Sequence, residues 1–304
     1  MPINLSPEFG FDMWFDQCYT VGSTAYYPQG LDVRKTDGAL DHFVSSLSQK
    51  HPLKSIGNGV VSASIKISDL LPIRSAFDNG AKSIKSLSQN LIDSSDEPFF
   101  LFTNFMEAHH PHRLTRGYEK GTEVPKRWSS DEIDLMAFND GIRSVKHNKE
   151  YVENFRSLYQ ASVDYLDRIL ASYVQDIQER TDNEVTFIIT ADHGENLGYE
   201  SDNHLFGHTG SLSEGLLHVP FDIINPPKEA EINENGTFSQ TSLPNIVNQL
   251  VREEQITLQK SRYVSAEVVN GGLLESPDNY WDRMIRCVYD TEVQKKITWD
   301  TTGD

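Results

Sequence analysis

The sequence predicts an α/β fold, in which a mainly parallel sheet carries helices on both faces. Two observations predict this class. Three short segments are apolar almost throughout, as strands buried on both faces are, and a long segment with helical periodicity lies between the first two. A chain of 304 residues can bury a core of that size, as one large domain or as one domain with a small appendage.

The three strand candidates are residues 99–106, 184–190 and 218–224. The first reads Phe-Phe-Leu-Phe-Thr-Asn-Phe-Met, which alternates too little between apolar and polar side chains for a strand exposed on one face. The other two have the same character. Because strands buried on both faces are typical of parallel sheets covered by helices, these segments predict a doubly covered sheet.

The clearest helix is predicted over residues 152–180, where apolar side chains recur every three or four residues on one helical face. They are Val152, Phe155, Tyr159, Val163, Leu166, Leu170, Tyr173 and Ile177. Together with the strand at 184–190, this helix forms an α/β crossover unit. A further helix is predicted over 243–253, because Ser242 is a plausible N-cap and Pro244 lies early, where proline is tolerated.

Two segments are predicted to be irregular. Residues 115–149 are polar, and Trp-Ser-Ser-Asp-Glu at 128–132 resembles a helix start. This segment is either an insertion that shapes a substrate pocket or a plain surface excursion. Residues 225–231, Asn-Pro-Pro-Lys-Glu-Ala-Glu, are predicted to form a loop from their proline and charge content.

Composition excludes several classes of protein. The net charge is −18, from 27 Lys and Arg against 45 Asp and Glu, which argues against a nucleic-acid or anionic-membrane partner. No apolar run approaches the ~20 residues that cross a bilayer, and Met-Pro-Ile-Asn-Leu-Ser at 1–6 has neither the basic nor the apolar region of a secretory signal. We therefore expect no membrane segment, and a cytoplasmic location if Met1 is the true start. Cys18 and Cys287 are far apart, so a disulfide framework is not expected.

Two of the predicted strands end in residues suited to a metal site. The first is followed by a segment containing His109, His110 and His112, and the second by Asp192 and His193. In a doubly wound sheet, ligands collect outside the carboxyl ends of the strands. An aspartate oxygen with a neutral imidazole suits Zn, Mn or Fe and is also usable for Ca or Mg. A glycine-rich loop then supplies His204 and His208 before the third strand. His112, His147 and His218 are weaker candidates for substrate contact.

At this point the sequence resembles a known family. Thr-Ala-Asp-His-Gly-Glu-Asn-Leu-Gly at 190–198 and Phe-Gly-His-Thr-Gly-Ser-Leu-Ser-Glu-Gly-Leu-Leu-His-Val-Pro-Phe at 206–221 resemble the later part of the sulfatase catalytic domain, in the alkaline-phosphatase-like superfamily. Met-Glu-Ala-His-His-Pro at 106–111 is similar to that family's His-x-Pro element. Residues 155–167 resemble the helix that precedes its Asp-His strand, and Gly-Phe-Asp at 10–12 a segment between its earlier motifs. The resemblance runs from about Pro7 to Pro226.

The resemblance implies roles for particular residues. Asp192 and His193 would bind one divalent metal ion, with Ca, Mn and Zn not distinguishable. His109 and His208 would contact the oxygens of the transferred sulfate or phosphate group, stabilising charge or protonating the leaving oxygen. His110 is a weaker substitute for His109, and His204 an additional candidate.

Two motifs of the family are absent from the chain. Members carry an acidic pair after an early strand and a nucleophile in a Cys/Ser-x-Pro-x-Arg motif, which sulfatases oxidise to formylglycine, and neither pattern occurs in this sequence. Asp192 and His193 supply two ligands, whereas catalytic metals commonly have three from protein. We therefore expect an α/β domain incomplete at its N-terminus and inactive by itself, either a truncated sequence or a remnant.

These observations support one function and leave two alternatives open. The first is a sulfatase-like hydrolase that cleaves sulfuric esters at a metal centre. The alternatives are a phosphodiesterase or phosphoglycol or phosphoethanolamine transferase of the same superfamily, and a non-catalytic remnant. The partner is thus a sulfate- or phosphate-ester substrate. We expect a partial catalytic domain over 1–228, continued by 229–304 with a small α+β part.

Overall fold

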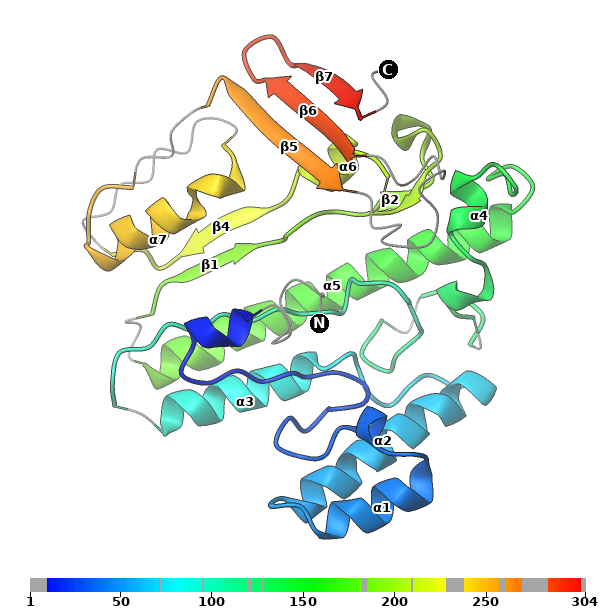
Figure 1. Cartoon of the computed structure of the whole chain (residues 1–304), viewed down its shortest axis with the longest axis vertical. Helices are drawn as coiled ribbons and strands as arrows, with labels where there is room; N and C mark the ends of the chain where they lie inside the picture. Colours follow the sequence, from blue (N-terminus) through cyan, green and yellow to red (C-terminus); the bar gives the residue numbers. More distant parts are fainter. Residues whose placement is uncertain are drawn as a thin grey trace. The chain divides into compact units, whose positions relative to one another are not determined.

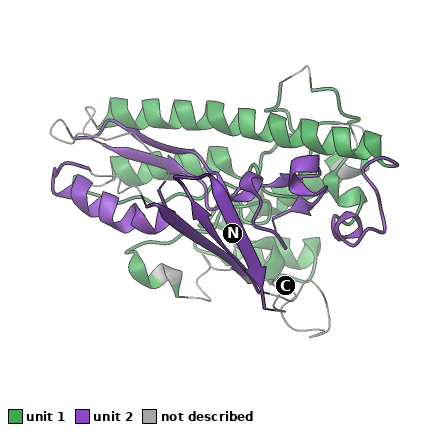
Figure 2. Cartoon of the chain, turned by 90° about the horizontal axis from the view of Figure 1, so that it is seen from above, with its two compact units in different colours: residues 1–134, 148–182 green, residues 135–147, 183–304 purple. Residues whose placement is uncertain are grey.

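The computed structural model describes residues 10–301, apart from 72, 95, 120–121, 127, 182–184, 209, 228–237, 257–260 and 270–283. The chain forms two compact units (Figure 2). Unit 1 contains residues 1–134 and 148–182, and unit 2 contains residues 135–147 and 183–304. The boundary predicted at residue 228 lies outside the described residues and stays a prediction.

Unit 1 is helical. Its elements in chain order are η3 (Phe11–Trp14), η4 (Val33–Lys35), α1 (Ala39–Leu47), α2 (Pro52–Leu70), α3 (Ala81–Asp93), η5 (Ser130–Glu132) and α5 (Lys149–Arg180). The helix predicted over 152–180 is confirmed as α5, the long helix in the middle of Figure 1. Four residues of its predicted apolar face, Val152, Phe155, Tyr173 and Ile177, are buried, whereas Val163 of the same predicted face is exposed.

Helices α3 and α5 lie side by side in unit 1 and run in the same direction. Lys85 pairs with Asp176 at 2.8 Å, Gln89 one turn later donates to the same Asp176, and Asp93 one turn after that pairs with Arg180. Residue numbers therefore rise together along the two helices, as they do when helices run parallel. Parallel neighbours need a long connection, which here includes the histidine-rich segment at 109–112.

Two buried carboxylates anchor the start of α3. The N-cap is Gly80, which has no side chain to accept from the first-turn N–H groups. Instead the N–H of Gly80 donates to Asp78 and that of Ala81 donates to Glu107 Oε1 at 2.8 Å. Burial raises the pKa of Glu107 to about 7; the Ala81 N–H opposes this, and the nearby charge of Asp78 adds to it.

Unit 2 combines short helices with small antiparallel sheets. In chain order it contains α4 (Met136–Asn139), β1 (Phe187–Thr190), β2 (Asn196–Leu197), η6 (Glu200–Asp202), β3 (Phe206–Gly207), α6 (Glu214–Leu217), β4 (Phe221–Ile224), η7 (Gln240–Ser242), α7 (Leu243–Val251), β5 (Tyr263–Val269), β6 (Met284–Asp290) and β7 (Lys295–Asp300). Helix α7 covers the β1–β4 pair through Ile246 and Leu250, and β5–β6–β7 packs on Leu212.

The strand candidates at 184–190 and 218–224 correspond to β1 and β4, but their pairing is antiparallel, Phe187 opposite Ile224 and Thr190 opposite Phe221. The prediction of a mainly parallel sheet is therefore not met within the described residues, although the chain combines helices and strands. The physical reason is the path of the connection. A parallel pair needs a crossover that carries the chain back to the starting end of the first strand, whereas after residues 191–220 the chain re-enters at Phe221, opposite Thr190 at the end of β1, and therefore runs back antiparallel.

The segment at 99–106 is a second correction. It forms no strand, and Phe99, Phe100 and Phe102 are exposed, where the sequence predicted burial on both faces. An apolar run becomes a strand only when another strand accepts its backbone hydrogen bonds, and no described residue pairs with it in that way. The helix predicted over 243–253 is confirmed as α7, with proline in its first turn. Among the described residues, no helix is long and apolar enough to span a membrane.

Candidate metal and anion site

The site begins where β1 ends, in unit 2. After Thr190 the chain turns through Ala191 and Asp192, and the N–H of Gly194 donates to the carbonyl of Leu216 at 2.9 Å. A Cβ atom on residue 194 would lie 1.9 Å from the carbonyl oxygen of Gly215. Only glycine permits this approach, so the Asp-His-Gly motif presses its backbone against α6 and aims the two preceding side chains elsewhere.

The hairpin formed by the two-residue strands β2 and β3 then brings Glu195 and His208 together. Strand β2 pairs with β3 so that Asn196 lies opposite Gly207. In an antiparallel pair, the next residues outward are therefore Glu195 and His208. The backbone of Phe206 is held at the same time by Asn139 of α4, whose amide both donates to it and accepts from it, at 3.0 and 2.9 Å.

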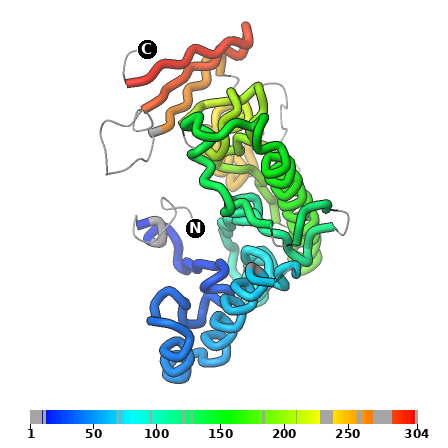
Figure 3. The backbone as a smooth tube through the Cα atoms, turned by 90° about the vertical axis from the view of Figure 1, so that its right-hand side faces the viewer, coloured from blue at the N-terminus to red at the C-terminus, as the bar shows by residue number. Residues whose placement is uncertain are grey.

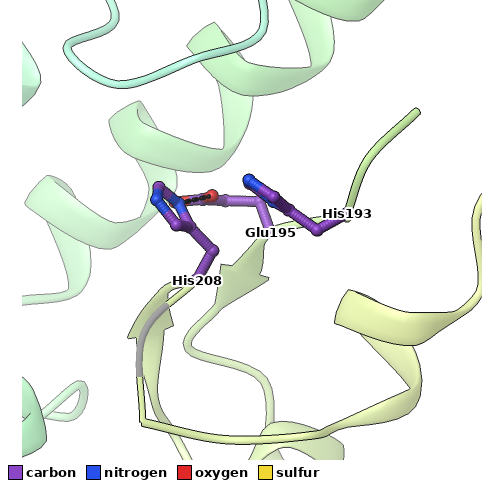
Figure 4. A group of neighbouring side chains, drawn as sticks. All are labelled: His193, Glu195 and His208. Atoms are coloured by element: carbon purple, nitrogen blue, oxygen red, sulfur yellow. Dashed lines mark hydrogen bonds and ion pairs between the residues drawn. The ribbon is translucent and has the colours of Figure 1, made fainter. Parts of the chain in front are cut away.

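Three side chains converge at this point (Figure 4). His208 Nδ1 lies 3.0 Å from Glu195 Oε2, and the rings of His193 and His208 face each other with centroids 4.4 Å apart. The ligand atoms of His193, Glu195 and His208 all lie within 4.8 Å of one another. Two imidazoles and a carboxylate form a donor set that suits Zn, Mn or Fe.

Glu195 is the buried member of this group. Its side chain is 5% exposed, and Oε1 has no hydrogen-bond partner among the described residues. The hydrogen bond to Glu195 raises the pKa of His208, partial burial opposes the rise, and the charges of Glu195 and Asp192 add to it. The carboxylate also selects the His208 tautomer that carries a proton on Nδ1.

Asp192 lies at the rim. Its side chain is 60% exposed, its Oδ1 accepts from the backbone N–H of His193 at 3.1 Å, and its Oδ2 is 3.8 Å from His193 Nε2. The structure thus brings His193 and His208 together, with Asp192 beside them, and the roles expected for these three residues stay predictions. Glu195 was missed as a partner, although its place two residues after His193 in the same motif was a usable signal.

The histidines predicted at the other strand end lie in unit 1. His109 is exposed, and its Nδ1 lies against the carbonyl of His110. His110 approaches Asp131 at 4.0 Å. His112 is 1% exposed, and neither ring nitrogen has a hydrogen-bond partner in the described structure; burial lowers its pKa to about 3. The predicted meeting of His109 with the unit 2 group stays a prediction.

Three further histidines contact residues close to them in the sequence. His204 Nδ1 lies 3.2 Å from the carbonyl of Gly198 within the β2–β3 hairpin, and its φ of 61° marks it as part of the turn. His147 Nδ1 lies 2.9 Å from Ser144 Oγ. His218 is the C-cap of α6, and its backbone N–H donates to the carbonyl of Glu214. None of the three belongs to the described His193–Glu195–His208 group.

Part of the irregular segment 115–149 lines a cavity of about 260 Å³ in unit 1. Lys126, Trp128 and Asp131 contribute to its wall together with Arg113. The charges of both signs would favour a zwitterionic or polar ligand over a purely apolar one. Whether this segment shapes a substrate pocket stays a prediction.

In a comparison with protein families, the family model described as Sulfatase matches residues 7–251. That range contains the Asp192–Glu195 motif, His208 and the histidine-rich segment at 109–112. Comparison with curated proteins and with solved structures finds no match.

Proposed function

The chain belongs to the sulfatase family, of the alkaline-phosphatase-like superfamily, and from this premise we propose that its unit 2 site binds a divalent metal ion for the hydrolysis of sulfuric esters. Asp192 and His193 are the proposed ligands, and His208 is the proposed contact to the sulfate oxygens, with His109 as a second. The observation that carries the proposal is the convergence of His193, Glu195 and His208 within 4.8 Å.

The residues fit a metal ion. A buried carboxylate oxygen without a hydrogen-bond donor, Glu195 Oε1, is costly unless a cation or a proton is near it. Ligands that each lie about 2.0–2.2 Å from one ion can be at most about 4.4 Å apart. Asp192 Oδ2 and His193 Nε2 lie 3.8 Å apart, so small side-chain rotations would let both reach one ion. When bound, the metal would polarise the sulfate group and neutralise its charge.

His208 would then act beside the metal. Glu195 holds Nδ1, so the ring is fixed in orientation, and its raised pKa favours the protonated form. A protonated imidazole can donate to a sulfate oxygen or protonate the leaving oxygen. The Glu195 carboxylate therefore orients the His208 ring and stabilises its positive charge, as carboxylates that accept from the second ring nitrogen of functional histidines do in other sites.

A metal-binding experiment tests the proposal. The purified chain is titrated with Zn, Mn and Ca by calorimetry, and retained metal is measured after dialysis. We expect about one ion per chain, with affinity reduced at least about 100-fold in Asp192→Ala and in His193→Ala. The matched control is Asp222→Ala, since Asp222 is an exposed aspartate of β4 in the same unit. Unchanged metal retention in Asp192→Ala would remove that residue from the ligand set.

Turnover distinguishes the reaction classes. Because the chain lacks the Cys/Ser-x-Pro-x-Arg motif, we expect it to hydrolyse an aryl sulfate negligibly by itself. Robust metal-dependent hydrolysis of the sulfate would refute that account of the nucleophile. Cleavage of an aryl phosphate diester but not the sulfate would favour the phosphodiesterase or transferase alternative, and metal-free protein inert to both esters would favour the remnant.

A further inference from the structure

Helices α1 and α2 expose large apolar side chains. Leu40 is 79% exposed, Leu53 85% and Leu70 73%, and the same surface includes Phe43, Val44, Leu47, Val60 and Ile67. The two helices are adjacent at the blue end of the chain (Figures 1 and 3). Exposed apolar patches of this size are unusual on monomeric proteins and mark interaction sites.

The exposed face of α2 has the spacing of a coiled-coil seam. Counting Leu53 as position a of a heptad, the a and d positions through the helix are Leu53, Ile56, Val60, Ala63, Ile67 and Leu70. The opposite face is the one that packs inside unit 1, through Val61 and Ile65 against Tyr26. A seam with period 3.5 on the outward face is built to receive another helix.

The apolar stripe of α1 extends this seam. Helix α1 faces α2 with its polar side: His42 Nε2 lies 2.8 Å from the carbonyl of Ser55, and a Cβ atom on Gly59 would lie 2.8 Å from the His42 ring. A short turn joins the two helices, so they run antiparallel. The apolar stripe of α1 consists of Leu40, Phe43, Val44 and Leu47. At about 100° of rotation per residue, this stripe and the seam of α2 point to the same side of the helix pair.

We propose that this face of α1 and α2 is a dimer interface, and that the occupant of the seam is α2 of a second copy of this chain. The exposed parts of the eight side chains amount to on the order of 1,000 Å², comparable to the ~800 Å² that each partner buries in a standard-size interface. The inference concerns unit 1 alone and does not depend on the proposed function.

Charge permits a second copy at the seam and argues against an anionic membrane. The chain carries −18, which opposes self-association wherever acidic surfaces would meet. The e and g positions beside the seam are Gly57, Gly59, Ser64 and Lys66, so no carboxylate flanks it. One lysine is far from the basic cluster that holds an amphipathic helix on an anionic membrane.

Light scattering after size exclusion tests the proposal on the full chain. We expect a mass of twice 34.5 kDa for the wild-type chain, falling to 34.5 kDa in the Val60→Glu/Ile67→Glu double variant, with the dissociation constant raised at least about 100-fold. Val163→Glu is the matched control, because Val163 is an exposed valine on α5 of the same unit. It should remain dimeric, and circular dichroism should show equal helix content in all three.

A cross-link gives a second readout, which detects the dimer itself and does not depend on disrupting it by mutation. Val60 lies near the middle of the seam, so two copies of Val60→Cys come close whether the helices pair parallel or antiparallel. In a Cys18→Ser background, a short bismaleimide should link the Val60→Cys chains and leave Val163→Cys chains single. A wild-type monomer at 100 µM, a dimer that survives the double glutamate variant, or a monomer that binds anionic vesicles would each overturn the proposal.

Discussion

Replacement of Glu107 by glutamine should change how the stability of the protein depends on pH. Glu107 is 2% exposed, and only one of its carboxylate oxygens, Oε1, has a hydrogen-bond partner in the described structure. Its pKa is raised from 4.5 to about 7, mainly by burial. Glutamine keeps an oxygen for the Ala81 N–H and has no charge to bury.

The sign follows from proton linkage. Between pH 4.5 and about 7 the folded protein holds the Glu107 proton while the unfolded chain releases it, so the free energy of unfolding falls as pH rises through this window. One pH unit corresponds to about 1.36 kcal/mol, so the complete loss above pH 8 is about 3 kcal/mol. At pH 5 the Glu107→Gln variant should lie within about 1 kcal/mol of the wild type; at pH 8 it should be about 3 kcal/mol more stable.

Urea unfolding at pH 5, 6, 7 and 8 measures the difference, with Glu123→Gln as control because Glu123 is an exposed carboxylate of the same unit. A ¹³C carboxyl titration by NMR gives the Glu107 pKa directly. If the free energies of wild type and Glu107→Gln differ by the same amount at every pH, or if the carboxyl titrates near 4.5, burial does not control this group and the reasoning is wrong.

Three other substitutions follow from single contacts. Gly194→Ala should lower the free energy of unfolding by at least about 2 kcal/mol, because its Cβ would meet the Gly215 carbonyl at 1.9 Å; an unchanged melting temperature would contradict this close approach. His112→Phe should be neutral or stabilising by about 1–2 kcal/mol, since it removes two buried nitrogens without partners; a destabilisation above 2 kcal/mol would reveal a partner. Glu195→Gln should lower the pKa of His208, measured by NMR, while Glu214→Gln, at an exposed glutamate of the same unit, should leave it unchanged.

Local patterns predicted several elements correctly. The apolar side chains at intervals of three and four residues specify α5 because one helical face must be buried, whatever covers it. The β-branched and aromatic run before Asp192 specifies β1 for a similar reason. Both signals lie within a few residues of the element they describe, so no distant contact is needed to interpret them.

Strand direction and pairing could not be obtained in the same way. The segments at 187–190 and 221–224 have the composition of buried strands in either direction, and their antiparallel register depends on the path of residues 191–220 between them. The segment at 99–106 has the same composition but forms no strand. Whether such a run becomes a strand depends on backbone partners elsewhere in the chain, which its own composition does not encode.

The candidate metal and anion site shows the same division between local pattern and tertiary contact. From the sequence, the Asp-His-Gly motif and the later His208 identify the family and the residue types of the site, because chemistry restricts which side chains can bind a metal or an anionic group. The pairing of Glu195 with His208 depends on the register of β2 and β3, and the approach of Gly194 to Gly215 depends on where α6 lies. Side-chain identity is a local property, whereas proximity depends on pairing between distant segments, and for that reason it emerges only in the folded chain.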